Sequence, residues 1–150
     1  MKIAQSLSSV LAAAVVVLTG CSHVDQKVRA GQVVDVLDQN AAGRSFIETI
    51  GIGASDPKLP TATQRKALAR DAAIVKAQYE MLAMVKGVEL EGGVKVDRAL
   101  ETDSGLTSRL RETIAGAEIV KSEYTSDDGC VVTLRLPKKR LERLMGVAFR

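Results

Sequence analysis

The longest stretch of the 150-residue chain without glycine or proline covers residues 61–86, and it constrains the fold more than any other feature. Its first residue, Thr61, is a candidate N-cap, and Gln64 three residues later completes a capping-box pattern. We predict one long helix over residues 62–86, which ends at Gly87 as its C-terminal cap. A helix of this length must bury one face against a second layer of structure.

Apolar residues recur along this helix at alternating spacings of four and three. We expect the core-facing stripe to consist of Leu68, Ala72, Val75, Tyr79 and Leu82. A second set broadens the apolar arc and comprises Ala67, Ile74, Met81 and Val85, whereas the charged remainder comprises Arg65, Lys66, Arg70, Lys76 and Glu80. A broad arc rich in alanine predicts close packing on a sheet. The alternative is that the stripe forms a seam with a partner helix.

Segments that favour strands lie on both sides of this helix. We predict strands at residues 46–53, 88–97, 117–126 and 130–136, the second of them half-buried and bent or turned at Gly92 and Gly93. Asp127, Asp128 and Gly129 predict a hairpin between the last two strands, because such turns need a residue with positive φ.

Two shorter helices complete the predicted elements. One covers residues 100–115, with Asp103 or Ser104 as its N-cap and Gly116 as its C-terminal cap, and the other covers residues 138–145 and ends at Gly146. The predicted fold class is α+β. We expect a small, largely antiparallel sheet of about four strands, with one long helix and two shorter helices packed on it.

The first twenty residues have the pattern of an export signal. Lys2 precedes an unbroken apolar run over residues 10–18, which is too short to span a bilayer but fits a secretory signal peptide. Leu18, Thr19, Gly20 and Cys21 follow, and this sequence resembles a bacterial lipobox. The resemblance implies cleavage between Gly20 and Cys21, with a diacylglycerol and a further acyl chain on Cys21.

These signals divide the chain into three parts. We predict a lipoprotein signal peptide at residues 1–20, a lipidated cysteine and tether at 21–45, and an α+β domain at 46–150. The tether has one local ordered piece near residues 33–37. Ser22 stands where lipoproteins retained at the inner membrane typically carry aspartate, so the resemblance implies the outer membrane, facing the periplasm. His23 is then a residue of the tether.

Composition argues against several function classes. Aromatic residues make up 3% of the chain, too few for the stacking platforms of a single-strand nucleic-acid binder. A single histidine excludes a Ser–His–Asp triad and a His-rich metal site within the domain, and two cysteines form neither a zinc ribbon nor a disulfide framework. We therefore predict no metal, no cofactor and no nucleic-acid partner.

Four features have both a functional and a structural interpretation. Gly51 and Gly53 lack the rest of a phosphate-loop fingerprint, so we expect either close backbone packing or a bend there. Glu89 and Glu91 are a carboxylate pair on an open strand face, where a solvated surface is favoured over catalysis.

The other two features concern a thiol and a cluster of positive charges. Cys130 is either a small buried residue or the site of an intermolecular disulfide, which an odd cysteine in an exported protein suggests. The cluster is either the solvated side of the last helix or a contact for an anionic membrane surface, and it consists of Lys138, Lys139, Arg140 and Arg143.

The pattern as a whole resembles the LPP-twenty family of Gram-negative outer-membrane lipoproteins, which includes a flagellar assembly lipoprotein. The resemblance covers roughly residues 46–145 and lies in the Gly51–Ile52–Gly53 strand, the alanine-rich segment 64–73, and the segments 82–88, 114–120 and 136–137. It implies a protein without enzymatic activity, and in flagellar members the domain assembles into rings or disks.

The sequence thus predicts a non-enzymatic lipoprotein of the cell envelope, which either forms homo-oligomers or docks on an envelope assembly, the flagellar basal structure among them. Exposed strand edges in a small sheet favour such association. The alternative is a periplasmic binding module for peptidoglycan or a glycolipid, which would need a concave pocket with convergent polar groups. A hydrolase without histidine is the least supported hypothesis.

Overall fold

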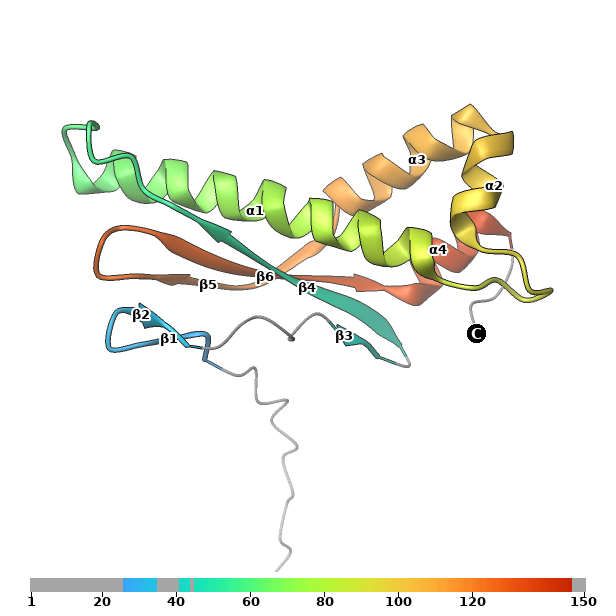
Figure 1. Cartoon of the computed structure of the whole chain (residues 1–150), viewed down its shortest axis with the longest axis horizontal. Helices are drawn as coiled ribbons and strands as arrows, with labels where there is room; N and C mark the ends of the chain where they lie inside the picture. Colours follow the sequence, from blue (N-terminus) through green and yellow to red (C-terminus); the bar gives the residue numbers. More distant parts are fainter. Residues whose placement is uncertain (1–25, 35–40, 44, 147–150) are drawn as a thin grey trace, which may run out of the picture.

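A four-stranded antiparallel sheet with one long helix across its face forms the centre of the computed structural model, which describes residues 26–34, 41–43 and 45–146 (Figure 1). The strand order is β3-β4-β6-β5, where the strands are β3 (Ala41–Ala42), β4 (Phe46–Gly53), β6 (Cys130–Pro137) and β5 (Glu118–Tyr124). The α+β class predicted from the sequence is confirmed.

The helices cover one face of this sheet and one of its ends. Helix α1 (Ala62–Gly87) lies across the face, and the shorter helices gather near its C-terminal end; these are α2 (Val96–Thr102), α3 (Ser104–Ala115) and α4 (Lys138–Met145) (Figure 1). A small hairpin lies on the opposite face and is formed by β1 (Val28–Arg29) and β2 (Gln32–Val33).

Small residues allow α1 to lie very close to β4. Ala69, Ala73 and Ala77 are fully buried on the helix. Across from them, a Cβ added at Gly51 or Gly53 would overlap the backbone of α1. The hydroxyl of Thr49 donates a hydrogen bond to the Ala77 carbonyl oxygen at 2.9 Å. The prediction of close backbone packing at the two glycines is therefore confirmed.

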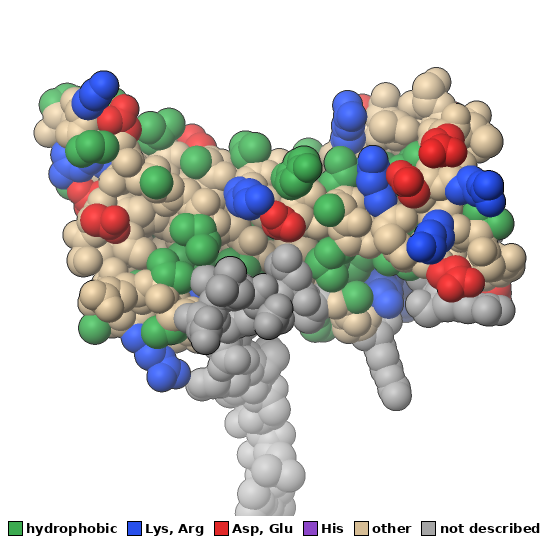
Figure 2. All heavy atoms as spheres, in the orientation of Figure 1, with side chains coloured by type: hydrophobic (Ala, Val, Ile, Leu, Met, Phe, Trp, Pro, Cys, Tyr) green, Lys and Arg blue, Asp and Glu red, His purple; other side chains and the backbone are tan. Residues whose placement is uncertain are grey.

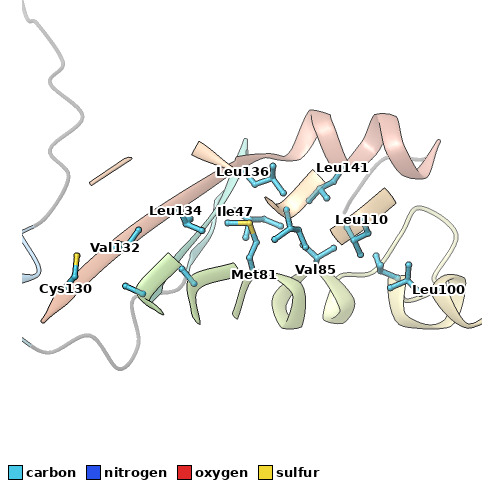
Figure 3. Close-up of a cluster of buried hydrophobic side chains, with 14 of the residues drawn as sticks. Ile47, Met81, Val85, Leu100, Leu110, Cys130, Val132, Leu134, Leu136 and Leu141 are labelled. Atoms are coloured by element: carbon cyan, nitrogen blue, oxygen red, sulfur yellow. The ribbon is translucent and has the colours of Figure 1, made fainter. Parts of the chain in front are cut away.

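Larger side chains fill the core where α1 moves away from the sheet. Figure 3 shows Met81 and Val85 of α1 among side chains from β4, β6, α3 and α4, namely Ile47, Leu134, Leu136, Leu110 and Leu141. Each of these residues is fully buried. Truncating one such residue to alanine typically costs about 2–5 kcal/mol, so this end of the domain contributes much of its stability.

The prediction of which face of α1 is buried is wrong. Leu68, Val75 and Tyr79 are 47%, 65% and 66% exposed, and Ala72 is also exposed. Leu82 is half-buried. The physical reason is the close contact with β4, because only alanine-sized side chains fit between the helix and Gly51 or Gly53. The helix therefore turns its alanines inward and its larger apolar residues outward.

The predicted second set along α1 is partly buried. Met81 and Val85 lie in the core, Ile74 is half-buried, and Ala67 is exposed. These residues lie on the side of the buried alanines, so the second set is closer to the true inner face than the first.

The prediction of a sheet strand at residues 88–97 is wrong, but the predicted alternative of a turn at Gly92 and Gly93 is confirmed. Glu89 and Lys95 form only an isolated antiparallel bridge, and the chain turns at Gly92 and Gly93, which have φ angles of +111° and +81°. Val96 is already the first residue of α2. The alternating valines and leucines reflect partial burial beside the end of α1 rather than membership of the sheet.

The helix predicted at residues 100–115 is divided into α2 and α3. Asp103 separates them and acts as the N-cap of α3, because its carboxylate accepts a hydrogen bond from the Leu106 amide at 3.1 Å. Gly116 follows α3 as its C-cap, as predicted.

Most of the other predicted caps are confirmed. The Thr61 hydroxyl caps α1 by accepting from the Gln64 amide at 3.2 Å. Gly146 ends α4 with φ at +70°. Gly87, however, is still helical, and the C-cap of α1 is Val88 in an extended conformation. In the hairpin between β5 and β6, the residue with positive φ is Asp128, at +65°.

Part of the segment predicted as a tether belongs to the fold. The hairpin of β1 and β2 lies earlier than the ordered piece that we expected near residues 33–37, most of which lies outside the described residues. Ala41 and Ala42 pair with Glu48 and Ile47, so β3 adds an edge to the sheet before Phe46.

Candidate functional site

The candidate functional site is an apolar stripe on the outer face of α1. We define the outer stripe as Leu68, Ala72, Val75 and Tyr79, which follow one another at spacings of four, three and four residues. This is the spacing of a helix–helix seam. Figure 2 shows hydrophobic side chains along the outer edge of the molecule over α1. An exposed apolar stripe of this kind typically marks an interaction surface.

Two shallow grooves flank the outer stripe. One, of about 170 Å³, lies between α1 and α3 and is lined by Tyr79, Leu82 and Ile114 together with Gln78, Arg111 and Ala115. The other, of about 420 Å³, lies between α1 and Tyr124 of β5. The Lys66 ammonium stacks over the Tyr124 ring at 5.6 Å. Only the first groove extends the apolar surface of the stripe onto a neighbouring element, because the second is lined in large part by the charged residues Lys66, Arg70 and Asp71.

Charged residues border the outer stripe on both sides. Asp71 and Lys76 are exposed and five residues apart, and on a helix they project to opposite sides of the stripe. The Lys76 ammonium is 2.6 Å from Glu80 and lies 5.5 Å from the centre of the Tyr79 ring. The hydrogen bond to Glu80 and its charge raise the pKa of Lys76 above the ordinary value, so this group is positively charged at neutral pH.

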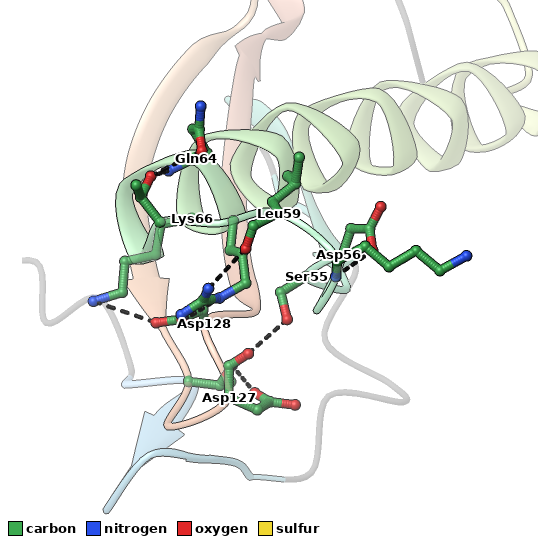
Figure 4. A network of polar contacts seen from close by, with 11 residues as sticks. Ser55, Asp56, Leu59, Gln64, Lys66, Asp127 and Asp128 are labelled. Carbon is green, nitrogen blue, oxygen red and sulfur yellow. Dashed lines mark hydrogen bonds and ion pairs between the residues drawn. The ribbon is translucent and has the colours of Figure 1, made fainter.

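A polar network fixes the start of α1 to the β5–β6 turn (Figure 4). The Arg65 guanidinium donates to the Asp128 carboxylate at 2.8 Å and to the Leu59 carbonyl oxygen at 2.9 Å. The Ser55 hydroxyl donates to the Asp127 carbonyl oxygen at 2.6 Å. These contacts hold the N-terminal half of the outer stripe in a defined position relative to the sheet.

Asp127 in the same turn has a shifted titration. The Thr125 hydroxyl lies 2.5 Å from the Asp127 carboxylate. This hydrogen bond, followed by those from the backbone amides of Asp127 and Gly129, lowers the pKa of Asp127 below its ordinary value. The carboxylate is thus an ionised structural acceptor of the turn.

The hairpin of β1 and β2 is attached to the sheet by the carboxylate of Glu123. This carboxylate accepts hydrogen bonds from the backbone amides of Lys27 at 2.9 Å and Val28 at 3.4 Å, and it lies 3.3 Å from the Lys121 ammonium. Glu123 is the ladder partner of Val131 on β6. The neighbours Cys130 and Val132 face α1, so Val131 and Glu123 point to the opposite face. No feature of the sequence indicated this contact.

The residues singled out in the sequence lie far apart in the structure. Cys130 is fully buried where β6 faces α1, and desolvation raises the pKa of its thiol. This position favours the interpretation of Cys130 as a small core residue over its interpretation as the site of an intermolecular disulfide. Glu89 and Glu91 are exposed, and Glu89 faces Lys95 in the bridge. Gly20, Cys21 and His23 lie outside the described residues.

The predicted basic cluster lies on α4, and only some of its side chains are exposed enough to contact an anionic membrane surface. Lys139 and Arg143 are exposed, Lys138 is half-buried, and the Arg140 guanidinium donates to the Gly116 carbonyl oxygen at 2.8 Å. Helix α4 and the β1–β2 hairpin lie at opposite ends of the sheet (Figure 1). The cluster is therefore far from the β1–β2 hairpin.

Neither a metal-binding cluster nor a membrane-spanning helix occurs in the described part of the chain. Its acidic, histidine and cysteine side chains do not gather in any group of three that could hold a metal ion. Among the described helices, none is both long and apolar enough to cross a membrane. Comparisons with protein-family models, with curated proteins and with solved structures found no match for this chain.

Proposed function

We propose that this chain is an outer-membrane lipoprotein that faces the periplasm, is anchored through acylated Cys21, and self-associates as a non-enzymatic component of the cell envelope. The lipobox at residues 18–21 supports the anchor. The exposed outer stripe of α1 supports self-association and is the observation that carries the proposal. The resemblance to LPP-twenty lipoproteins supports the envelope setting and suggests a flagellar basal structure as one form of it.

The partner of the outer stripe is a second copy of the chain, with the two α1 helices parallel. In a parallel seam the flanking positions exchange ion pairs. Asp71 and Lys76 have the five-residue separation that such a pair requires. The pair would form twice, once on each side of the seam, so the charges favour this alignment.

The position of the anchor also favours the parallel alignment. The β1–β2 hairpin lies at the end of the domain where α1 begins (Figure 1). Cys21 is only five residues before Gln26, the first described residue. A parallel pair places both hairpins at one end of the dimer, so that both acylated cysteines reach the same membrane. In an antiparallel pair the two hairpins would lie at opposite ends.

The test is disulfide trapping of the full-length protein in isolated outer membranes. In a parallel seam each stripe residue faces its own copy, so Val75→Cys should form a disulfide-linked dimer under mild oxidation. The matched control is Ser108→Cys, at an exposed position on α3 away from the stripe. Native Cys130 is present in all samples, and the wild-type protein measures its contribution.

We expect most of the Val75→Cys protein to run as a dimer without reductant, and Ser108→Cys and wild type to run as monomers. Equal dimer yields for the two cysteine variants would contradict the seam. A dimer that forms only when Ala72→Cys and Val75→Cys proteins are mixed would contradict the parallel alignment, because these positions face each other in an antiparallel pair.

A further inference from the structure

The segment that directly follows the proposed anchor is bound to the domain by a specific joint. We call residues 26–34, which include β1 and β2, the latch. Two consecutive amide donors near its start, on Lys27 and Val28, both point to the Glu123 carboxylate. The Glu123 side chain is only 11% exposed, and Lys27 is buried. A carboxylate that receives two consecutive backbone amides is a strong, charge-assisted acceptor.

The turn between β1 and β2 of the latch is bound at Ser126. The Gly31 carbonyl oxygen accepts from the Ser126 amide at 2.8 Å and from its hydroxyl at 3.2 Å. Gly31 has φ at +78°, and an added Cβ would lie 2.7 Å from the Ser126 Cβ. Only glycine allows this close contact. The latch therefore touches β5 at one point and the β5–β6 turn at the other.

The length of chain before the latch limits the distance to the membrane. Cys21 and Gln26 are separated by the four residues 22–25. Even fully extended, five steps of chain span at most about 18 Å. When the latch is bound, the β5–β6 end of the domain must lie within roughly this distance of the acylated residue.

Release of the latch and of β3 would lengthen the connection. The chain from Cys21 to Phe46 has twenty-five steps, which give a mean reach of about 25–30 Å as a flexible coil and a limit of about 90 Å when extended. The two states thus differ severalfold in how far the domain can reach from the membrane.

We propose that the latch sets the height and orientation of the domain on the lipid surface, with the β1–β2 hairpin and the β5–β6 turn facing the bilayer. The inference rests on the proposed anchor at Cys21. In the bound state the axis of α1 has a fixed direction relative to the membrane, and its N-terminal end is nearest to the lipid. In the released state the domain reaches farther and loses this orientation.

The experiment is limited trypsin digestion of the full-length lipoprotein in fragmented outer membranes, whose periplasmic face is open to the protease. Cleavage after Lys27 or Arg29 separates the domain from the membrane and gives soluble fragments that begin at Val28 or Ala30. Mass spectrometry of the supernatant distinguishes these from fragments that begin at Ser45. Bound residues resist cleavage because a protease requires locally unfolded chain.

Two variants should release the latch, each by removing one of its two contacts with the domain. Glu123→Ala removes the carboxylate acceptor, and Gly31→Val introduces a side chain into the contact with Ser126. We expect both to increase the rate of release at Val28 and Ala30 by at least tenfold. Glu118→Ala is the control on the same strand, because Glu118 is exposed at the far end of β5. It should keep the wild-type rate.

Release at the wild-type rate in both latch variants would overturn the inference. Fragments cut inside α1 in Glu123→Ala would show that this variant unfolds the domain, and Gly31→Val, which lies outside the sheet and helices α1–α4, then decides the question. If the wild-type protein does not fractionate with membranes, the anchor fails instead. Hydrogen exchange at the Lys27 and Val28 amides still tests the latch in that case, since both should exchange at least tenfold faster in Gly31→Val.

Discussion

Gly51 of β4 lies against the backbone of α1 so closely that a Cβ at this position would overlap the Ala73 carbonyl oxygen. This contact determines the rotation of α1 about its axis. With alanines facing the sheet, the larger apolar residues have no place in the core and remain on the outside. The proposed interaction surface is thus a consequence of two glycines on the neighbouring strand.

Gly51→Ala should therefore destabilise the domain. The added methyl group has to push α1 away from β4, and overpacking of a tight contact typically costs about 1–3 kcal/mol. Urea unfolding of the soluble Cys21→Ser chain measures this change. Gly87→Ala is the matched control, because nothing lies within 4 Å of a Cβ at this helical position. It should be neutral or stabilising by up to about 1 kcal/mol. Equal effects of the two substitutions would disprove the close contact.

The charges beside the outer stripe should control assembly without affecting folding. Asp71→Lys places two like charges together in a parallel seam and should weaken dimer formation at least tenfold in sedimentation experiments. Adding Lys76→Asp reverses the pair and should restore most of the affinity. Both variants should unfold at nearly the same urea concentration as wild type, because residues 71 and 76 are exposed. Failure of the second substitution to restore association would argue against the Asp71–Lys76 pair.

The sequence was sufficient for the helix at 62–86 and the strands at 46–53 and 130–136, because their caps, glycines and β-branched residues are local signals. It was not sufficient for the inner face of α1. The periodicity of Leu68, Val75 and Tyr79 is as regular as that of a buried stripe, and hydrophobicity alone ranks leucine and valine above alanine. The deciding information is the shape of β4 at Gly51 and Gly53, which belongs to tertiary packing.

The segment at residues 88–97 and the latch also have features that the sequence alone could not predict. The sequence indicated the turn at Gly92 and Gly93, but the alternating pattern of residues 88–97 did not reveal that α2 already begins at Val96. The contact between Lys27 and Glu123 joins residues 96 positions apart through a backbone amide, which has no side-chain signature. Such long-range contacts with the backbone leave no pattern in a single sequence.

Asp127 should make the hairpin turn sensitive to acid. Its pKa is lowered in the folded protein from an ordinary value of 3.8, so its contribution to stability is fully present above that value. The contribution is lost as the pH falls through the lower, folded pKa. Thr125→Val removes the first cause of the shift and should raise the Asp127 pKa toward its ordinary value. An NMR titration of the Asp127 carboxyl carbon measures it, and an unchanged pKa would show that the backbone amides suffice.

Cys130 should be unreactive in the folded protein. Its side chain is buried under α1, and desolvation raises its pKa above the ordinary value of 9.0, so little thiolate forms at neutral pH. In the soluble Cys21→Ser chain, a thiol reagent should modify Cys130 at least a hundredfold faster in urea than in buffer. Equal rates, or a disulfide-linked dimer of the wild-type protein, would favour the intermolecular disulfide.

The basic cluster on α4 should have little effect on membrane binding. Because α4 lies at the end of the sheet opposite the latch, Lys138→Glu combined with Lys139→Glu should leave cosedimentation of the full-length acylated protein with anionic vesicles unchanged. A clear loss of binding would support the alternative of an anionic-surface contact.

If a lipid on Cys21 holds a self-associating domain at the outer membrane, the mass of the mature N-terminal peptide will reveal the lipid. We expect this peptide, isolated from outer membranes, to begin at Cys21 and to carry a diacylglycerol and a further acyl chain, and we expect the Cys21→Ser protein to be absent from this fraction. An unmodified Cys21 peptide, or a chain still joined to residues 1–20 in the soluble fraction, would contradict the proposed anchor.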